Sequence, residues 1–139
     1  MSAVDRELLA ERAMVVSRHL ARVKERLPAQ PSELRPATDA SDAVILHLWQ
    51  AVQVVIDLAV SACFRWDLGA PTSYADAFRR LASGGVIDAA LADRLARVAG
   101  FRNVIAHAYD QLDMSRVHRA AVDGPRDLTA FLAALRDRL

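Results

Sequence analysis

Apolar residues recur at spacings of three and four along most of the chain, which is the period of an amphipathic helix. The first such run lies between Ser2 and Pro28 and carries Arg and Glu on its other face; its apolar members are Leu8, Leu9, Val15, Val16, Leu20, Val23 and Leu27. Ser2 followed by Asp5 is typical of a helix start. The pattern therefore predicts a first helix that ends at Pro28.

Residues 28–38 contain Pro28, Pro31 and Pro36, which forbid regular helix. We expect a long crossover loop here rather than a domain boundary, because the roughly 27 residues before it cannot bury a core alone. The whole chain, residues 1–139, is therefore expected to form a single domain.

The most hydrophobic part of the chain predicts a second helix, from a cap at Asp39 or Ser41 to about Arg65. A membrane span has to be considered, but polar residues recur every three or four positions in this helix, namely at His47, Gln50, Gln53, Asp57 and Ser61. An aspartate near the centre of a span costs about 2.5 to 3.5 kcal/mol. We therefore expect no membrane span, but the central helix of a soluble bundle, with its polar stripe facing a cleft or a subunit partner.

A turn over residues 66–72 is expected to lead into a short third helix, capped by Thr72 or Ser73 and ended by Gly84-Gly85. Asp88 then begins a fourth helix with one apolar face, made of Leu91, Leu95, Val98, Phe101, Ile105 and Ala108.

Beyond this helix, Asp113 predicts the start of a helix that reaches about Val122. Gly124-Pro125 predicts a break, and a last amphipathic helix is expected over residues 127–139. Only five Gly and five Pro interrupt the 139 residues, of which 53% are hydrophobic, so helix is favoured over strand throughout. These features predict an all-α fold, a single-domain antiparallel bundle of four long helices plus short ones.

The formal net charge is only +1, so any contact with a polyanion has to be local. Lys24 is the only lysine, so almost all of the positive charge is arginine, which suits bidentate phosphate contacts. A biased base composition of the genome would also explain this excess of arginine over lysine. Cys63 is the only cysteine, which excludes an intrachain disulfide and fits a reducing compartment. The charged N-terminus lacks the apolar core of a signal peptide, so we expect a cytoplasmic protein.

Four polar side chains crowd into the eight residues 102–109: Arg102, Asn103, His107 and Tyr109. At about 100° per residue, Arg102 and Tyr109 fall on one flank of the helix and Asn103 and His107 on the other, with Ala106 between them. The remaining arc is apolar and consists of Phe101, Val104, Ile105 and Ala108.

These groups suit phosphoryl chemistry on RNA. His107 can act as a general base near neutral pH, Arg102 can stabilise a charged transition state, and Asn103 can orient the imidazole. RNA supplies its own 2′-hydroxyl nucleophile, so the chemistry needs neither metal nor cofactor. Because Arg102 and His107 diverge by about 140° on one helix, a cleft lined by two copies across a two-fold axis would serve better.

Plainer interpretations apply to each residue taken alone. A single Arg, Asn or His on a helix is usually a surface residue, and Tyr109 can simply pack with its hydroxyl solvated. We assign no chemical function to His19 and His118. We expect His47 to lie at a subunit interface. The combination within one short window is what indicates a site.

The run Phe101-Arg102-Asn103-Val104-Ile105-Ala106-His107-Ala108-Tyr109-Asp110 resembles the signature of HEPN-domain proteins, and specifically of the HepT-like toxin branch, in which the histidine is followed two residues later by tyrosine. The segment Pro71-Thr72-Ser73-Tyr74-Ala75-Asp76-Ala77-Phe78 is also similar to that branch. The spacers Val104, Ile105 and Ala106 depart from the common pattern, where larger or basic residues are frequent.

The resemblance implies a helical homodimer that acts as a metal-independent endoribonuclease, the toxin of a type II toxin–antitoxin pair. Arg102 and His107 would be the catalytic pair and Asn103 a supporting residue. The implied partner is a minimal nucleotidyltransferase (MNT-type) antitoxin, which neutralises the toxin by transferring AMP to Tyr109, beside the catalytic arginine. A non-catalytic HEPN module, for nucleotide binding or as a scaffold with such a partner, and a purely structural dimerisation domain remain as alternatives.

Overall fold

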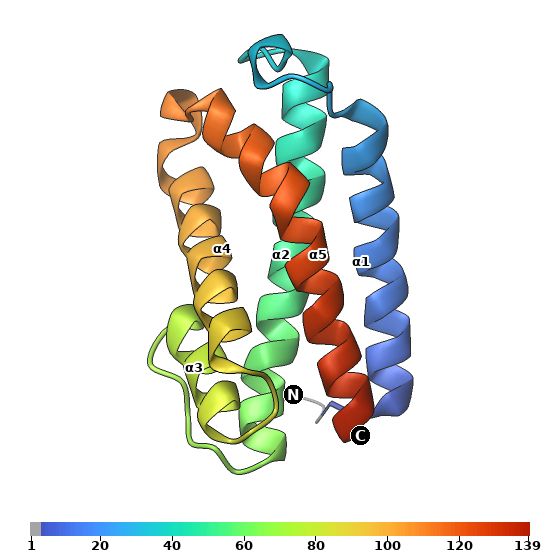
Figure 1. Cartoon of the computed structure of the whole chain (residues 1–139), viewed down its shortest axis with the longest axis vertical. Coiled ribbons are helices and arrows are strands. Elements are labelled where there is room, and N and C mark those ends of the chain that lie inside the picture. Colours follow the sequence, from blue (N-terminus) through green and yellow to red (C-terminus); the bar gives the residue numbers. More distant parts are fainter. Residues whose placement is uncertain (1–3) are drawn as a thin grey trace.

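Antiparallel helices make up the chain in the computed structural model, which describes residues 4–139 (Figure 1). In chain order, α1 (Arg6–Arg26), α2 (Asp39–Arg65), α4 (Ala89–Ala108) and α5 (Met114–Arg138) alternate in direction, and the shorter α3 (Tyr74–Ser83) packs beside the start of α4. The predicted all-α bundle of four long helices is confirmed. The predicted start at Ser2 lies outside the described residues, whereas Asp5 caps α1 by accepting a hydrogen bond from the Leu8 amide.

The central element is α2, which contacts each of the other four helices. Its cap is Thr38 rather than the predicted Asp39 or Ser41, and Ser41 completes a reciprocal capping box with Thr38. By length and composition α2 alone, among the described residues, could cross a membrane. Half of its most apolar window is buried inside the protein, and its inward residues, such as Leu48 and Ile56, form the middle of the core.

The proline-rich segment is a crossover loop, as predicted. It contains the single-turn 3-10 helix η1 (Pro31–Glu33), and Leu34 anchors it in the core with 2% of its surface exposed. His118 of α5 lies with its Nε2 atom 2.8 Å from the carbonyl oxygen of Pro28, which ties the start of the loop to α5. The structure thus gives His118 a packing role.

The predicted break at Gly124-Pro125 is wrong, because α5 is continuous with Pro125 inside it. A proline removes one backbone hydrogen bond, but the packing on either side of it favours a single helix. Inward residues continue past Pro125 at spacings of four and three, in the order Val117, Ala121, Gly124, Leu128, Phe131 and Leu135. Gly124 lies against Leu48 of α2, and Phe131 meets Phe78 of α3 edge to face.

A histidine pair joins α1 to α2. The Nδ1 atoms of His19 and His47 lie 3.0 Å apart, so His47 contacts α1 of its own chain, and its place at a subunit interface stays a prediction. The pKa of His19 is lowered, first by burial and then by the positive charges of His47, Arg18 and Arg22.

This pair predicts acid sensitivity. Because the pKa of His19 is lower in the folded protein, the unfolded chain binds this proton more readily, so the free energy of unfolding falls as pH drops below about 6.5. Urea denaturation at about pH 7.5 and about pH 5.5 measures the loss. His19→Gln is expected to make the free energy of unfolding less dependent on pH. His107→Gln, at an exposed position, is the control and should leave the pH dependence unchanged. An unchanged dependence in His19→Gln would contradict the assignment.

Candidate functional site

Arg102 is held in a defined position at the inner side of α4. Its Nε atom donates a 2.9 Å hydrogen bond to Oε1 of Gln53 on α2, and Gln53 in turn donates to Oδ1 of Asp57 over 2.9 Å. The guanidinium carbon lies 5.6 Å from the ring centroids of both Trp49 and Tyr74, within the range of cation–π attraction. The side chain is thus fixed by α2 and α3.

The positive charge of Arg102 has no carboxylate within ion-pair distance among residues 4–139. Its Nη1 atom donates a long, 3.4 Å hydrogen bond to Oδ1 of the neighbouring Asn103. A shallow depression of about 270 Å³ opens beside the guanidinium, lined by Trp49, Gln50, Gln53 and Arg102. An anion could therefore approach a cation that is already oriented.

His107 and Asn103 lie on the exposed side of α4, as the helical spacing predicts. Among the described residues, His107 has neither a hydrogen-bond partner nor an ion pair, and the residue is exposed to solvent. The structure brings Arg102 and Asn103 together and leaves His107 apart from Arg102. Five residues apart on one helix, the Arg102 and His107 side chains point about 140° away from each other.

Tyr109 begins a 3-10 turn, η2 (Tyr109–Gln111), at the point where α4 ends. Its hydroxyl donates a 2.6 Å hydrogen bond to Oδ1 of Asp42 in the first turn of α2, and 45% of the residue is exposed. This hydrogen bond, followed by burial and the negative charges of Asp42 and Asp110, raises the pKa of Tyr109 to about 12. The phenol is accessible and neutral at physiological pH.

Arg102 and Tyr109 both turn toward α2, which agrees with their predicted place on one flank. Their partners Gln53 and Asp42 are eleven residues apart, however, which corresponds to about 16 Å along a helix. Arg102 and Tyr109 therefore contact parts of α2 that are about three helical turns apart.

The apolar arc predicted for the same stretch is wrong at one position. Ile105 is buried, whereas Val104 is 39% exposed and Ala106 is also exposed. The end of α4 touches only part of the bundle, so a narrower arc than predicted faces the core. Val104, Ala106 and His107 together form an uncovered surface next to Asn103.

Two contacts of the site were not foreseen from the sequence. Nothing in the local sequence pattern singles out Asp42 or Trp49, yet they hold Tyr109 and Arg102. The partners are 67 and 53 residues away in sequence, and no local spacing joins them. One signal for the contact between Gln53 and Arg102 is present in the sequence, because Gln53 belongs to the polar stripe predicted to face a cleft or a subunit partner.

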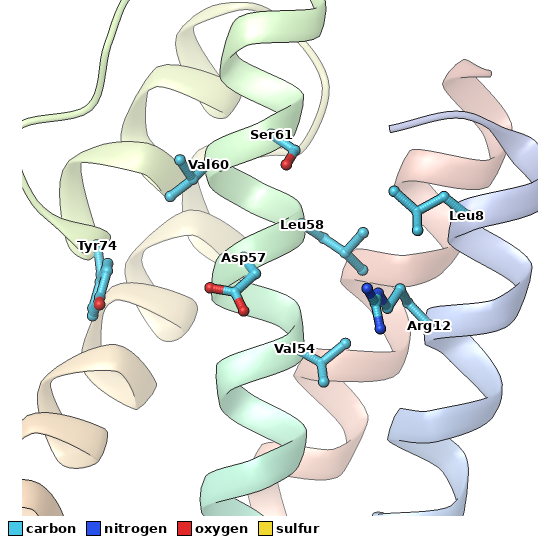
Figure 2. Close-up of a pocket in the computed structure, with 8 residues that line it drawn as sticks. All are labelled: Leu8, Arg12, Val54, Asp57, Leu58, Val60, Ser61 and Tyr74. Carbon is cyan, nitrogen blue, oxygen red and sulfur yellow. The ribbon is translucent and has the colours of Figure 1, made fainter. Parts of the chain in front are cut away.

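Part of the polar stripe on α2 faces a cleft, as predicted (Figure 2). Asp57 and Ser61 line a pocket of about 540 Å³ together with Tyr74 of α3 and Leu8 and Arg12 of α1. Figure 2 shows the Arg12 side chain reaching from α1 toward α2. Among residues 4–139, no three acidic, histidine or cysteine side chains gather in a way that could hold a metal ion.

The fold and the arginine–histidine motif define a helical protein of the HEPN ribonuclease class. The chain belongs to the ribonuclease HepT-like family, whose model matches residues 11–135. It is 25% identical to the mRNA nuclease HepT of Shewanella oneidensis over 130 residues, which cover 94% of this chain and 97% of the relative. A putative RNase of Archaeoglobus fulgidus is 39% identical over 80 residues, covering 56% of this chain and 58% of the relative. The prediction of a ribonuclease is confirmed at the level of the family.

Solved structures share the whole fold. A tri-AMPylated HEPN toxin from Shewanella oneidensis, in complex with its MNT antitoxin, superposes with a TM-score of 0.85 at 24% identity and covers 96% of this chain and 99% of its own. A toxin–antitoxin crystal structure with AMP-PNP also gives 0.85, at 23% identity, with 95% and 99% covered. YutE from Bacillus subtilis, a cytosolic protein of unknown function, gives 0.82 at 17% identity, with 100% and 93% covered.

Proposed function

We propose that this protein is the toxin of a toxin–antitoxin pair, a cytoplasmic endoribonuclease that cleaves RNA without a metal ion. One observation carries the proposal: Arg102 is fixed by Gln53 and two aromatic rings, carries a charge without a carboxylate partner, and shares the end of α4 with a solvent-facing His107. The relative named an mRNA nuclease supports the same class of substrate.

In the proposed reaction, His107 takes the proton of a ribose 2′-hydroxyl, and the oxygen attacks the adjacent phosphorus. The new 2′-oxygen–phosphorus bond forms as the bond to the 5′-oxygen breaks, and this leaving oxygen takes up a proton from water. Arg102 stabilises the charge that builds on the phosphoryl oxygens. Asn103 is placed to orient either the arginine or the substrate, because its amide oxygen already accepts from Arg102.

The divergence of Arg102 and His107 within one copy favours a homodimer in which Arg102 of one copy works with His107 of the other. The exposed surface beside His107 includes Val104 and Ala106, an apolar and a small residue that would let two α4 helices approach closely. A two-fold axis there gives two equivalent composite sites. It also concentrates positive charge locally although the chain carries only +1.

The proposed partner is a minimal nucleotidyltransferase that silences the toxin by transferring AMP to Tyr109. The exposed phenol, held by Asp42 at the end of α4, is a suitable acceptor. A similar HEPN toxin has been solved in complex with an MNT antitoxin and is tri-AMPylated. Since Gln53 and Asp42, which hold Arg102 and Tyr109, are about 16 Å apart along α2, inhibition would need several AMP units, or one unit that blocks the site of the other copy.

Purified protein and single-stranded RNA test the reaction. We expect cleavage to continue in excess EDTA, because no step needs a metal, and the 5′ fragments to end in a 2′,3′-cyclic phosphate. Electrophoresis measures the cleavage, and mass spectrometry of the fragments identifies their ends. Cleavage that stops in EDTA and returns with added magnesium would contradict the metal-independent route, and a protein that cleaves no RNA would leave the non-catalytic HEPN module as the better explanation.

A further inference from the structure

A groove lined by arginines runs between α4 and α5, on a different face of α4 from Arg102. Arg94 and Arg97 come from α4 and Arg116 and Arg119 from α5, and the groove has a volume of about 290 Å³. Within each pair the spacing of three residues places both side chains on the same face of their helix. The two helices therefore present two short rows of guanidinium groups to one another.

Two carboxylates, those of Asp123 and Asp127, also line the groove and offset half of this charge. Arg94 pairs with Asp127 across the groove, with 2.9 Å between Nε and Oδ1. Arg97, Arg116 and Arg119 make no ion pair with a carboxylate within 4.0 Å in the described part of the chain. Four arginines against the two aspartates that line the groove leave an excess of two positive charges gathered in one place, although the net charge of the whole chain is only +1. Such a local excess favours an anionic ligand.

The groove also has an aromatic wall. Phe101 lines it and is only partly buried, so part of the ring is available to a ligand. A positively charged groove with an aromatic side chain is the usual binding site for a single-stranded nucleic acid, whose phosphates meet the cations while a base stacks on the ring. A free phosphate would leave the aromatic wall unused.

The groove is connected to the candidate active site through α4. Phe101 directly precedes Arg102, and Arg97 lies ten residues before His107, which is about 15 Å along the helix and about 80° around it. Arg102 is about 140° from Arg97 and faces α2 instead. A strand lying in the groove would therefore reach the catalytic helix from the side of His107.

We propose that this arginine groove binds the sugar–phosphate backbone of single-stranded RNA and guides the substrate to His107. The proposal rests on the proposed function, because it takes RNA to be the substrate. It adds a binding surface outside the catalytic residues, made by α5 together with the outer face of α4.

The test compares two double variants that each remove two positive charges. Arg116→Gln/Arg119→Gln alters the groove, while Arg18→Gln/Arg22→Gln alters two exposed arginines of α1, on the other side of the bundle from α4 (Figure 1). Both are made in full-length protein with His107→Ala, so that RNA is not consumed. Fluorescence anisotropy with a labelled single-stranded RNA gives the dissociation constant over a range of salt concentrations, and circular dichroism checks that both variants remain helical.

We expect the groove variant to bind RNA about tenfold more weakly, with the slope of log K against log salt reduced by about 1.4, which corresponds to two lost contacts with single-stranded phosphates. The α1 variant is expected to bind as the parent does. Equal affinity and slope in the two variants would overturn the proposal, and so would a groove variant that loses only its binding to the antitoxin. RNA binding through the groove by a wild-type protein that cleaves nothing would support this inference while refuting the proposed function.

Discussion

Replacing His107 with alanine is expected to slow RNA cleavage by about 10²- to 10⁴-fold, the usual contribution of a positioned general base. The loss should appear in the single-turnover rate with enzyme in excess, because His107 acts on the 2′-hydroxyl proton and not in holding the strand. The side chain is exposed, without contacts that the structure needs, and alanine is a good helix former, so the fold should be unaffected.

Arg102→Ala should give a loss of similar size, because the developing phosphoryl charge would no longer face a fixed cation. Arg102→Lys keeps the charge but not the directed Nε hydrogen bond to Gln53, so it should recover only part of the rate. Arg126→Ala is the matched control, since its side chain is 79% exposed on α5. Wild-type rates in either His107→Ala or Arg102→Ala would refute the assigned site.

Tyr109→Phe is expected to abolish neutralisation by the antitoxin. When the variant is co-expressed with the partner, its intact mass should stay that of the unmodified chain, and the cells should remain poisoned. Wild type under the same conditions should gain one or more AMP units and lose its toxicity. A Tyr109→Phe variant that is still neutralised normally would show that the antitoxin acts by simple masking.

Asp42 should matter for the same transfer. With a pKa of about 12, the phenol of Tyr109 does not ionise unaided near neutral pH, and the Asp42 carboxylate 2.6 Å away is placed to take its proton as the oxygen attacks the α-phosphorus of ATP and pyrophosphate leaves. Asp42→Asn keeps the size of the side chain and removes the base. The same mass measurement should therefore show slower modification of Asp42→Asn than of wild type.

Much of the fold could be predicted because local signals and helical period agree. Asp88 and the Gly84-Gly85 pair end or begin helices where the sequence indicates. The break predicted at Gly124-Pro125 is wrong because buried residues continue at helical spacing on both sides of this pair. Packing of these buried residues against α2 decides the outcome, and Gly124 lies among them next to Leu48.

The site was only partly predictable from the sequence, because some of its contacts depend on packing between helices. The helical period places Arg102 and His107 on different sides of α4, and in the structure Arg102 contacts α2 while His107 is exposed. The period could not reveal that Asp42 holds Tyr109 or that Trp49 lies under Arg102, because these contacts depend on how α2 docks against α4. It also implied that Tyr109 continues the helix, whereas the chain turns into a 3-10 segment there.

The composite site of two copies is tested most directly by a purified heterodimer. One copy carries Arg102→Ala, the other carries His107→Ala, and two different affinity tags isolate the mixed species. If Arg102 of one copy works with His107 of the other, one of the two sites is intact, so RNA cleavage should return to about half of the wild-type rate per dimer. A heterodimer as inactive as its two parents would contradict the composite site.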